Sequence, residues 1–162
     1  MRKYSLLSVF LLFTMLLTSG ISLAQSVEEY KEVIEKNNSL MKEAMLNGNA
    51  HAGIQFYAKD AISMPNQSPM VEGIDAILKN NEMMLSSEWK VKDFITNIQR
   101  IIPSGKMITE IGTFKMIITG PGMEAPFEEV GKYVTIWEDQ GNMDLKIKVE
   151  IWNSDSNPAE QK

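Results

Sequence analysis

The chain has 162 residues, 16 basic and 21 acidic side chains, and no cysteine. Its length suits one domain, because domains usually hold about 100 to 200 residues. The acidic balance argues against a nucleic-acid or anionic-membrane partner, since both are bound through clustered basic side chains. The absence of cysteine excludes disulfides, and the single histidine, His51, cannot assemble a typical zinc site. We therefore expect His51 at the surface, with no metal and no cofactor.

Residues 1–24 have the pattern of a secretory signal peptide. Two basic residues precede an uncharged run from Leu6 to Leu17, and the small residues Ser22 and Ala24 are spaced as at a cleavage site. The run is shorter than the ~20 apolar residues of a spanning helix, so we expect cleavage after Ala24 and no membrane insertion afterwards. Removal of this segment leaves a net charge of −7 and predicts a secreted or periplasmic protein.

Two helices are predicted next. Ser26 and Glu29 form a capping box, and an apolar stripe at three- and four-residue steps follows it as far as Asn47 and Gly48. Asn37 falls within this stripe, so it either lines a cavity or lies at the solvent-exposed margin of the stripe. Asn49 can cap a second, short helix over Ala50 to Ala58.

The rest of the chain is predicted to be one more helix and a set of strands. A short strand over Ala61 to Met64 is followed by a helix that begins after Gly73 and ends around Ser86 and Ser87. Long strand patterns then cover Lys90–Ile102, Lys106–Thr119 and two arms between Gly131 and Asn153, which meet at the turn signal Gln140-Gly141-Asn142. This order predicts one α+β domain over residues 25–153 with segregated layers, and a flexible tail over 154–162.

The last strand pattern presents two different surfaces. Side chains alternate with period two along a strand, so the aliphatic and the polar or aromatic residues fall on opposite faces. One face carries Leu145, Ile147, Val149 and Ile151, and the other carries Lys146, Lys148, Glu150 and Trp152.

Several of these segments, in this order, resemble the nuclear transport factor 2-like superfamily, in particular its SnoaL-like, ketosteroid-isomerase-like branch. The matching pieces span most of residues 28–155 and are Asn47-Gly48-Asn49, Phe56-Tyr57-Ala58-Lys59-Asp60-Ala61, Gly73 before Ile77, and Gly131 to Asn153. The resemblance implies a cone in which a curved antiparallel sheet wraps the helices around a pocket, and it implies a dimer.

The same resemblance orients the final hairpin. It places Tyr133, Thr135 and Trp137 on the concave face with Lys148, Glu150 and Trp152. The convex face then carries Val134 and Ile136 with the four aliphatic residues of the last strand. Because so much apolar surface is unusual on a monomer, we predict a homodimer through the convex sheet face.

A pocket for a small, mainly apolar organic ligand follows from this orientation. Its predicted lining is Tyr57, Met64, Tyr133, Trp137, Glu150 and Trp152. Two alternatives stay open: the aromatic residues belong to the core, or Lys148 and Glu150 lie on a solvated strand face. Glu110 is a weaker second carboxylate, because the alternation of its strand does not fix the face on which it lies.

Catalysis is not assigned by the sequence. The resemblance implies a tyrosine, an aspartate base and a protonated aspartate in ketosteroid isomerases, but the nearest positions here are Met41, Met64 and Thr135, which cannot transfer those protons. The leading hypothesis is therefore ligand binding. The alternatives are a lyase, isomerase or hydrolase with Glu150 as general acid and base, and a non-catalytic interaction module whose pocket is filled by its own side chains.

Overall fold

A computed structural model describes residues 27–155, as three helices and one six-stranded sheet. The predicted signal peptide, Ser26 and residues 156–162 lie outside the described residues. The N-terminal helix covers residues 27–46 and is followed by α2 (Ala50–Ile54) and α3 (Ile74–Ser86). The strands are β1 (Tyr57–Met64), β2 (Val71–Glu72), β3 (Lys90–Ser104), β4 (Met107–Thr119), β5 (Phe127–Asp139) and β6 (Leu145–Ser154).

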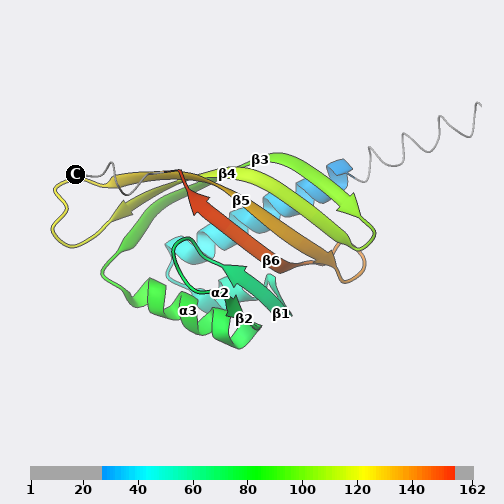
Figure 1. Ribbon diagram of the computed structural model, residues 1–162, viewed down its shortest axis with the longest axis horizontal. Helices are drawn as coiled ribbons and strands as arrows, with labels where there is room; N and C mark the ends of the chain where they lie inside the picture. Colours follow the sequence, from blue (N-terminus) through cyan, green and yellow to red (C-terminus); the bar gives the residue numbers. More distant parts are fainter. Residues whose placement is uncertain (1–26, 156–162) are drawn as a thin grey trace, which may run out of the picture.

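The strands form one sheet in the order β2-β1-β6-β5-β4-β3, with β1 and β6 parallel and the other neighbours antiparallel. The N-terminal helix crosses behind this curved sheet in Figure 1, and α2 and α3 lie at its lower end beside β1 and β2. The predicted α+β class, a curved sheet wrapped around helices, is confirmed. No helix in residues 27–155 has the length and apolar character needed to cross a membrane.

Several predicted boundaries shift because strand pairing competes with local propensity. The second helix ends at Ile54 rather than Ala58, because the Phe56 carbonyl already accepts a hydrogen bond from the Ile147 amide at 2.7 Å. β6 also continues through Ser154, and the Asp155 amide donates to the Val130 carbonyl at 2.9 Å. The first two residues of the predicted tail are therefore held against the sheet.

Two apolar clusters fill the space between sheet and helices. The larger one joins Ile34 of the N-terminal helix to buried residues of β4, β5 and β6, namely Ile108, Trp137, Leu145 and Ile147. The smaller one joins α2, α3 and β1 through Ile54, Ala58, Ala61 and Ile77. Tyr57 packs against both clusters, so it stands at their boundary.

The predicted alternation of the last strand is wrong at one point, because β6 contains a bulge. Trp137 pairs with Ile147 and Ile136 pairs with Val149, which leaves Lys148 as an extra residue. A bulge of one residue reverses the faces on its two sides. Glu150 and Trp152 therefore share the inner face with Leu145 and Ile147, which are only 1–2 % exposed.

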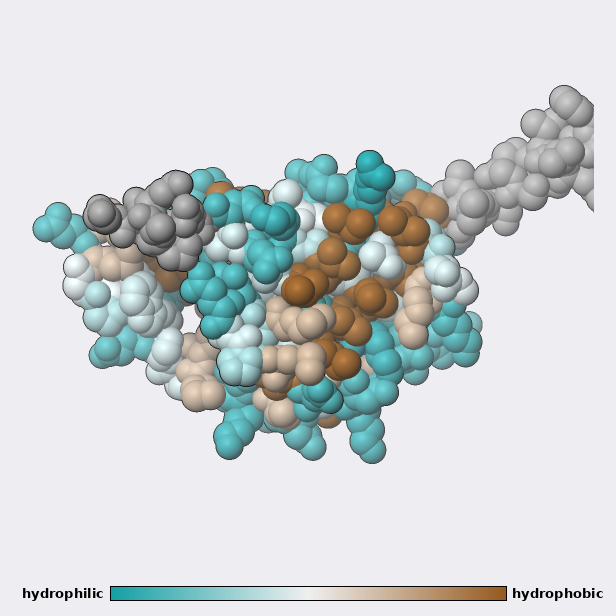
Figure 2. Space-filling model, viewed as in Figure 1, coloured by the Kyte–Doolittle hydropathy of each residue, from teal (hydrophilic) through white to brown (hydrophobic). Residues whose placement is uncertain are grey.

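The outer face keeps a smaller aliphatic surface than the sequence predicts. It carries Val134, Ile136, Val149 and Ile151, all partly exposed, while Lys148 binds Asp60 and so does not line the interior. Figure 2 shows a hydrophobic patch where β5 and β6 face the viewer. The outward placement of Leu145 and Ile147 and the inward placement of Lys148 were both incorrect.

Candidate functional site

Two carboxylates lie on the inner face of the sheet. Glu110 on β4 pairs with Thr135 on β5, and Thr135 pairs with Glu150 on β6. The two glutamates are therefore separated by two strand spacings, roughly 10 Å between their Cα atoms. Thr135 lies between them and is 7 % exposed.

Glu110 is completely buried and accepts three hydrogen bonds. The Asn38 amide donates to Oε1 at 2.8 Å, the Tyr133 hydroxyl donates to the same oxygen at 2.7 Å, and the Trp137 indole donates to Oε2 at 2.8 Å. A buried carboxylate is tolerated only when such donors replace its water. Both oxygens of Glu110 are thus occupied by the protein itself.

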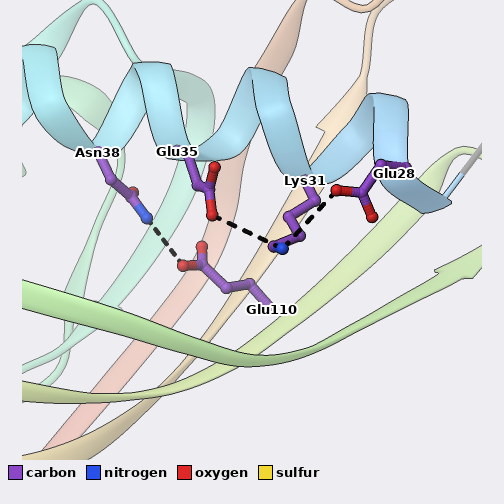
Figure 3. A network of polar contacts seen from close by, with 5 residues as sticks. All are labelled: Glu28, Lys31, Glu35, Asn38 and Glu110. Carbon is purple, nitrogen blue, oxygen red and sulfur yellow. Dashed lines mark hydrogen bonds and ion pairs between the residues drawn. The ribbon is translucent and has the colours of Figure 1, made fainter.

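Asn38 is the link between the N-terminal helix and this carboxylate. In Figure 3 its side chain reaches from the helix down to Glu110 on the sheet, whereas Lys31 on the same helix is held by Glu28 and Glu35 at 3.7 and 3.9 Å. Asn37, the residue that the sequence singled out, is the neighbour of the one that makes this contact. The Glu110 cluster therefore fixes the helix to the sheet.

Gly112 explains how Tyr133 reaches Glu110. The two residues are cross-strand partners, and a Cβ at Gly112 would lie 2.5 Å from the Tyr133 ring and hydroxyl. The ring consequently lies across the backbone of β4, in the space that any larger side chain would fill. Glycine at this position is required by the close approach of the ring.

Glu150 accepts hydrogen bonds through only one of its two oxygens. The Tyr57 hydroxyl and the Ser63 hydroxyl both donate to its Oε1, at 2.9 and 2.7 Å. Ser63 is 4 % exposed and lies on β1, the parallel neighbour of β6, where it pairs directly with Glu150. These contacts place Glu150 at the boundary between the two apolar clusters.

The second oxygen of Glu150 accepts no hydrogen bond from the described residues. Glu150 Oε2 and the Thr135 hydroxyl have no hydrogen-bond partner among residues 27–155, and in the same residues no such unpartnered atom is fully buried. Both atoms therefore retain some surface that water can touch.

Burial changes the acidity of these groups. It raises the pKa of both Glu110 and Glu150, and the hydrogen bonds that each accepts act in the opposite direction. Burial also raises the pKa of Tyr57 and Tyr133, and the neighbouring glutamate raises each further. The tyrosines therefore stay protonated and act as hydrogen-bond donors to the carboxylates.

The predicted lining residues do not all meet. Tyr57, Tyr133, Glu150 and Trp152 share the inner face, with Tyr133 and Trp152 as cross-strand partners. Trp137 is on this face but is 0 % exposed, because it is packed in the larger core cluster. Its polar contact is the hydrogen bond that its indole donates to Glu110. Met64 pairs with Ile151 and lies on the outer face, because it follows Ser63 by one residue. The prediction that Met64 lines the pocket is therefore wrong.

Sequence reasoning missed Ser63 and Asn38. Ser63 is a small polar residue in the otherwise apolar end of β1, Ala61–Met64, and this weak signal gained meaning only when β1 was paired with β6. Asn38 was missed because its helix position lies one residue from the apolar stripe. Neither contact follows from spacing along the chain.

Two shallow surface hollows lie elsewhere. One, of about 330 Å³, is on the outer sheet face near Ile95, Lys115 and Val130. The other, of about 370 Å³, lies between α2 and α3, where exposed His51 is 3.3 Å from Glu82. Neither is lined by Glu150 or Glu110.

Comparison with solved structures identifies the fold. No family model and no curated protein matches the chain. A ketosteroid isomerase-like protein from Erwinia carotovora superposes with a TM-score of 0.67 at 13 % identity, over 78 % of this chain and 96 % of that one.

Two further structures agree. An NTF2-like superfamily protein from Salmonella enterica gives a TM-score of 0.66 at 9 % identity, over 83 % of this chain and 97 % of that one. An NTF-2 like protein of unknown function from Shewanella oneidensis gives 0.58 at 14 % identity, over 76 % and 98 %. At such identities the likeness concerns the fold alone.

Proposed function

We propose that this chain, which has the nuclear transport factor 2-like fold, binds a small, mainly apolar organic molecule against the inner face of its sheet. The observation that carries the proposal is Glu150, whose Oε1 is fixed by Tyr57 and Ser63 while its Oε2 is left open. Ligand sites commonly combine apolar walls with a few fixed polar groups of this kind.

The surroundings of Glu150 suit such a ligand. Tyr57 belongs to both apolar clusters, and Trp152 is a half-buried aromatic residue two positions from Glu150 on the same face. Aromatic side chains provide large contact areas with few rotatable bonds. The polar anchor and the apolar walls are therefore adjacent.

Native mass spectrometry of protein purified from its own host tests the proposal. We expect a retained small molecule in the wild type and its loss in Glu150→Gln and in Trp152→Ala. Glu138→Gln is the matched control, because Glu138 lies on the other face of the sheet, 3.9 Å from Lys148. Unchanged occupancy in the two site variants would remove the assignment.

An enzymatic role is the second candidate. The raised pKa of Glu150 and its open oxygen are properties of a general acid or base, and lyases, isomerases and hydrolases use such groups. Activity found in a substrate screen should then lose one limb of its pH profile in Glu150→Gln. Full activity in that variant would exclude Glu150 as the catalytic residue.

The outer aliphatic patch supports a homodimer. Val134, Ile136, Val149 and Ile151 form one contiguous surface on β5 and β6. Ile151→Lys should shift the sedimentation coefficient to that of a monomer, whereas Asp75→Lys on exposed α3 should not. Ile147 is unsuitable for this test, because it is buried in the core. Identical sedimentation of Ile151→Lys and wild type would refute this dimer.

Export remains part of the proposal. The pattern in residues 1–24 supports secretion or a periplasmic location. N-terminal sequencing of protein recovered from cell fractions checks it, with Gln25 expected as the first residue outside the cytoplasm. Recovery of the uncleaved chain in the cytoplasm alone would contradict it.

A further inference from the structure

The hydroxyl hydrogen atoms of the two residues that contact Glu150 are already used in hydrogen bonds to its carboxylate. A tyrosine and a serine hydroxyl each have one hydrogen, and those of Tyr57 and Ser63 both point to Glu150 Oε1. Neither residue can donate to a ligand without releasing the carboxylate. The cluster therefore offers a ligand acceptor atoms, among them Oε2 of the Glu150 carboxylate, whose charge is shared by its two oxygens.

In the neighbouring Glu110 cluster, the Asn38 amide uses one of its two N–H groups on Glu110. The Tyr133 hydroxyl and the Trp137 indole each have one hydrogen, and both are used by Glu110. Thr135, between the two glutamates, is more than nine-tenths buried and has an unpartnered hydroxyl that can accept or donate. Thr135 and Glu150 are directly paired residues of β5 and β6 and share the inner face of the sheet.

Among the described residues, no basic side chain contacts either carboxylate. Lys148 is turned outward to Asp60 at 2.5 Å, Lys146 binds Asp144 at 3.0 Å, and Lys42 binds Asp93 at 2.7 Å. A ligand anion at Glu150 would thus lie beside a partly buried carboxylate with no cation to offset the repulsion, which is unfavourable. A cation would instead supply the partner that a partly buried carboxylate lacks.

We propose, resting on the ligand-binding function above, that the ligand is an apolar organic amine whose ammonium group binds Glu150 Oε2 and the Thr135 hydroxyl. The geometry selects against carboxylate-bearing molecules of the same shape. An alcohol, which has one donor and no charge, should bind between these extremes.

Three probes of similar shape test this inference on the full folded domain: phenethylamine, phenethyl alcohol and phenylacetate. Dissociation constants measured by saturation-transfer NMR at neutral pH should show phenethylamine binding at least about ten-fold more tightly than phenylacetate, the usual effect of one charged hydrogen bond. Glu150→Gln should remove this preference, and Glu138→Gln should retain it. The wild-type comparison alone decides the matter if Glu150→Gln does not fold.

The outcomes separate this inference from the proposed function. Equal or tighter binding of phenylacetate, lost in Trp152→Ala, would overturn the amine assignment and leave a ligand site in place. Absence of binding by all three probes would also overturn the amine assignment, and the mass spectrum of the host-purified protein would then decide the proposed function separately. A preference for phenethylamine that persists in Glu150→Gln would show that another group makes the selection.

Discussion

Glu110 and Glu150 lie on the same face of one sheet, on either side of Thr135, and burial raises the pKa of both. They differ in how many donors the protein supplies. Glu110 accepts three hydrogen bonds through both oxygens, whereas Glu150 accepts two through a single oxygen. The comparison teaches that burial alone does not distinguish the two carboxylates, and that they differ in whether protein donors occupy both oxygens.

The two clusters also join different parts of the fold. Glu110 connects the N-terminal helix, through Asn38, to the centre of the sheet. Glu150 connects β6 to β1 at the boundary of the two apolar clusters, through Ser63 and Tyr57. The first arrangement stabilises the docking of a helix, and the second stabilises the pairing of two strands.

The largest expected effect comes from replacing each carboxylate by an amide. In Glu110→Gln the new NH₂ group must face one of three donors, so a buried donor loses its acceptor and the free energy of unfolding should fall by about 3 kcal/mol. In Glu150→Gln the amide oxygen can keep both hydroxyl donors and the NH₂ group can face the open side, so the loss should be below about 1 kcal/mol. Urea denaturation of both variants measures the difference.

Equal losses in the two variants would contradict the distinction between a closed and an open carboxylate. A larger loss in Glu150→Gln would reverse it and assign the structural role to the β1–β6 pair. Circular dichroism of each variant before denaturation establishes that the native helices and strands are present.

Local signals predicted the elements well where one turn or cap fixes them. Gly73, with φ of 86°, ends β2 and starts α3, and the predicted helix agrees with the observed Ile74–Ser86. The turn after β5 uses Gly141, Asn142 and Met143 at positive φ, of which the first two were part of the predicted turn signal. Backbone conformations that few residue types adopt can be predicted from the sequence, because glycine and asparagine are preferred there.

The site was predicted only in part, because its geometry depends on long-range register. Alternation grouped Glu150 with Trp152, and the family resemblance placed both on the inner face. The bulge at Lys148 reversed the rest of the strand, and no residue type at that point predicts a bulge. The face of Glu110 and the partner role of Ser63 became clear only from the pairing of β4 with β5 and of β1 with β6. Such pairings join residues far apart in the chain, so no local pattern encodes them.

An intermediate effect is expected from adding one methyl group beside the closed cluster. In Gly112→Ala the new Cβ would lie 2.5 Å from the Tyr133 ring, so the ring must move away from Glu110. Overpacking of this kind costs about 1 to 3 kcal/mol of the free energy of unfolding.

Thermal and urea denaturation measure this cost, and Gly53→Ala is a useful control because its Cβ would meet only Ala44 at an ordinary 3.9 Å. Tyr133→Phe combined with Gly112→Ala separates the two contributions, since the double variant has no hydroxyl left to displace. If Gly112→Ala were as stable as the wild type, the ring would not lie across β4 as described.

The smallest effect is the pH dependence of the open carboxylate. A raised pKa means that the folded protein binds the Glu150 proton more tightly than the unfolded chain does, so the associated stability is fully present below the ordinary value of 4.5 and is lost as pH rises through the folded pKa. Asp60 and Asp93, whose pKa values are lowered by Lys148 and Lys42, act below 3.8 and therefore outside this window. The free energy of unfolding of the wild type should consequently decrease between about pH 4.5 and neutrality, relative to that of Glu150→Gln, which lacks this carboxyl group. Glu110, whose pKa is also raised, is present in both proteins and cancels in the comparison.

Urea denaturation of the two proteins across this range measures the slope. A difference that stays constant with pH would mean that the carboxyl group of Glu150 is as well solvated in the folded protein as in the unfolded chain, and the open side of the site would then be an ordinary exposed surface. If the slope is present, saturating phenethylamine should flatten it. An ammonium group bound at Oε2 stabilises the ionised carboxylate and lowers its pKa towards the unfolded value, so this change would connect the acidity of the site to the charge of its ligand.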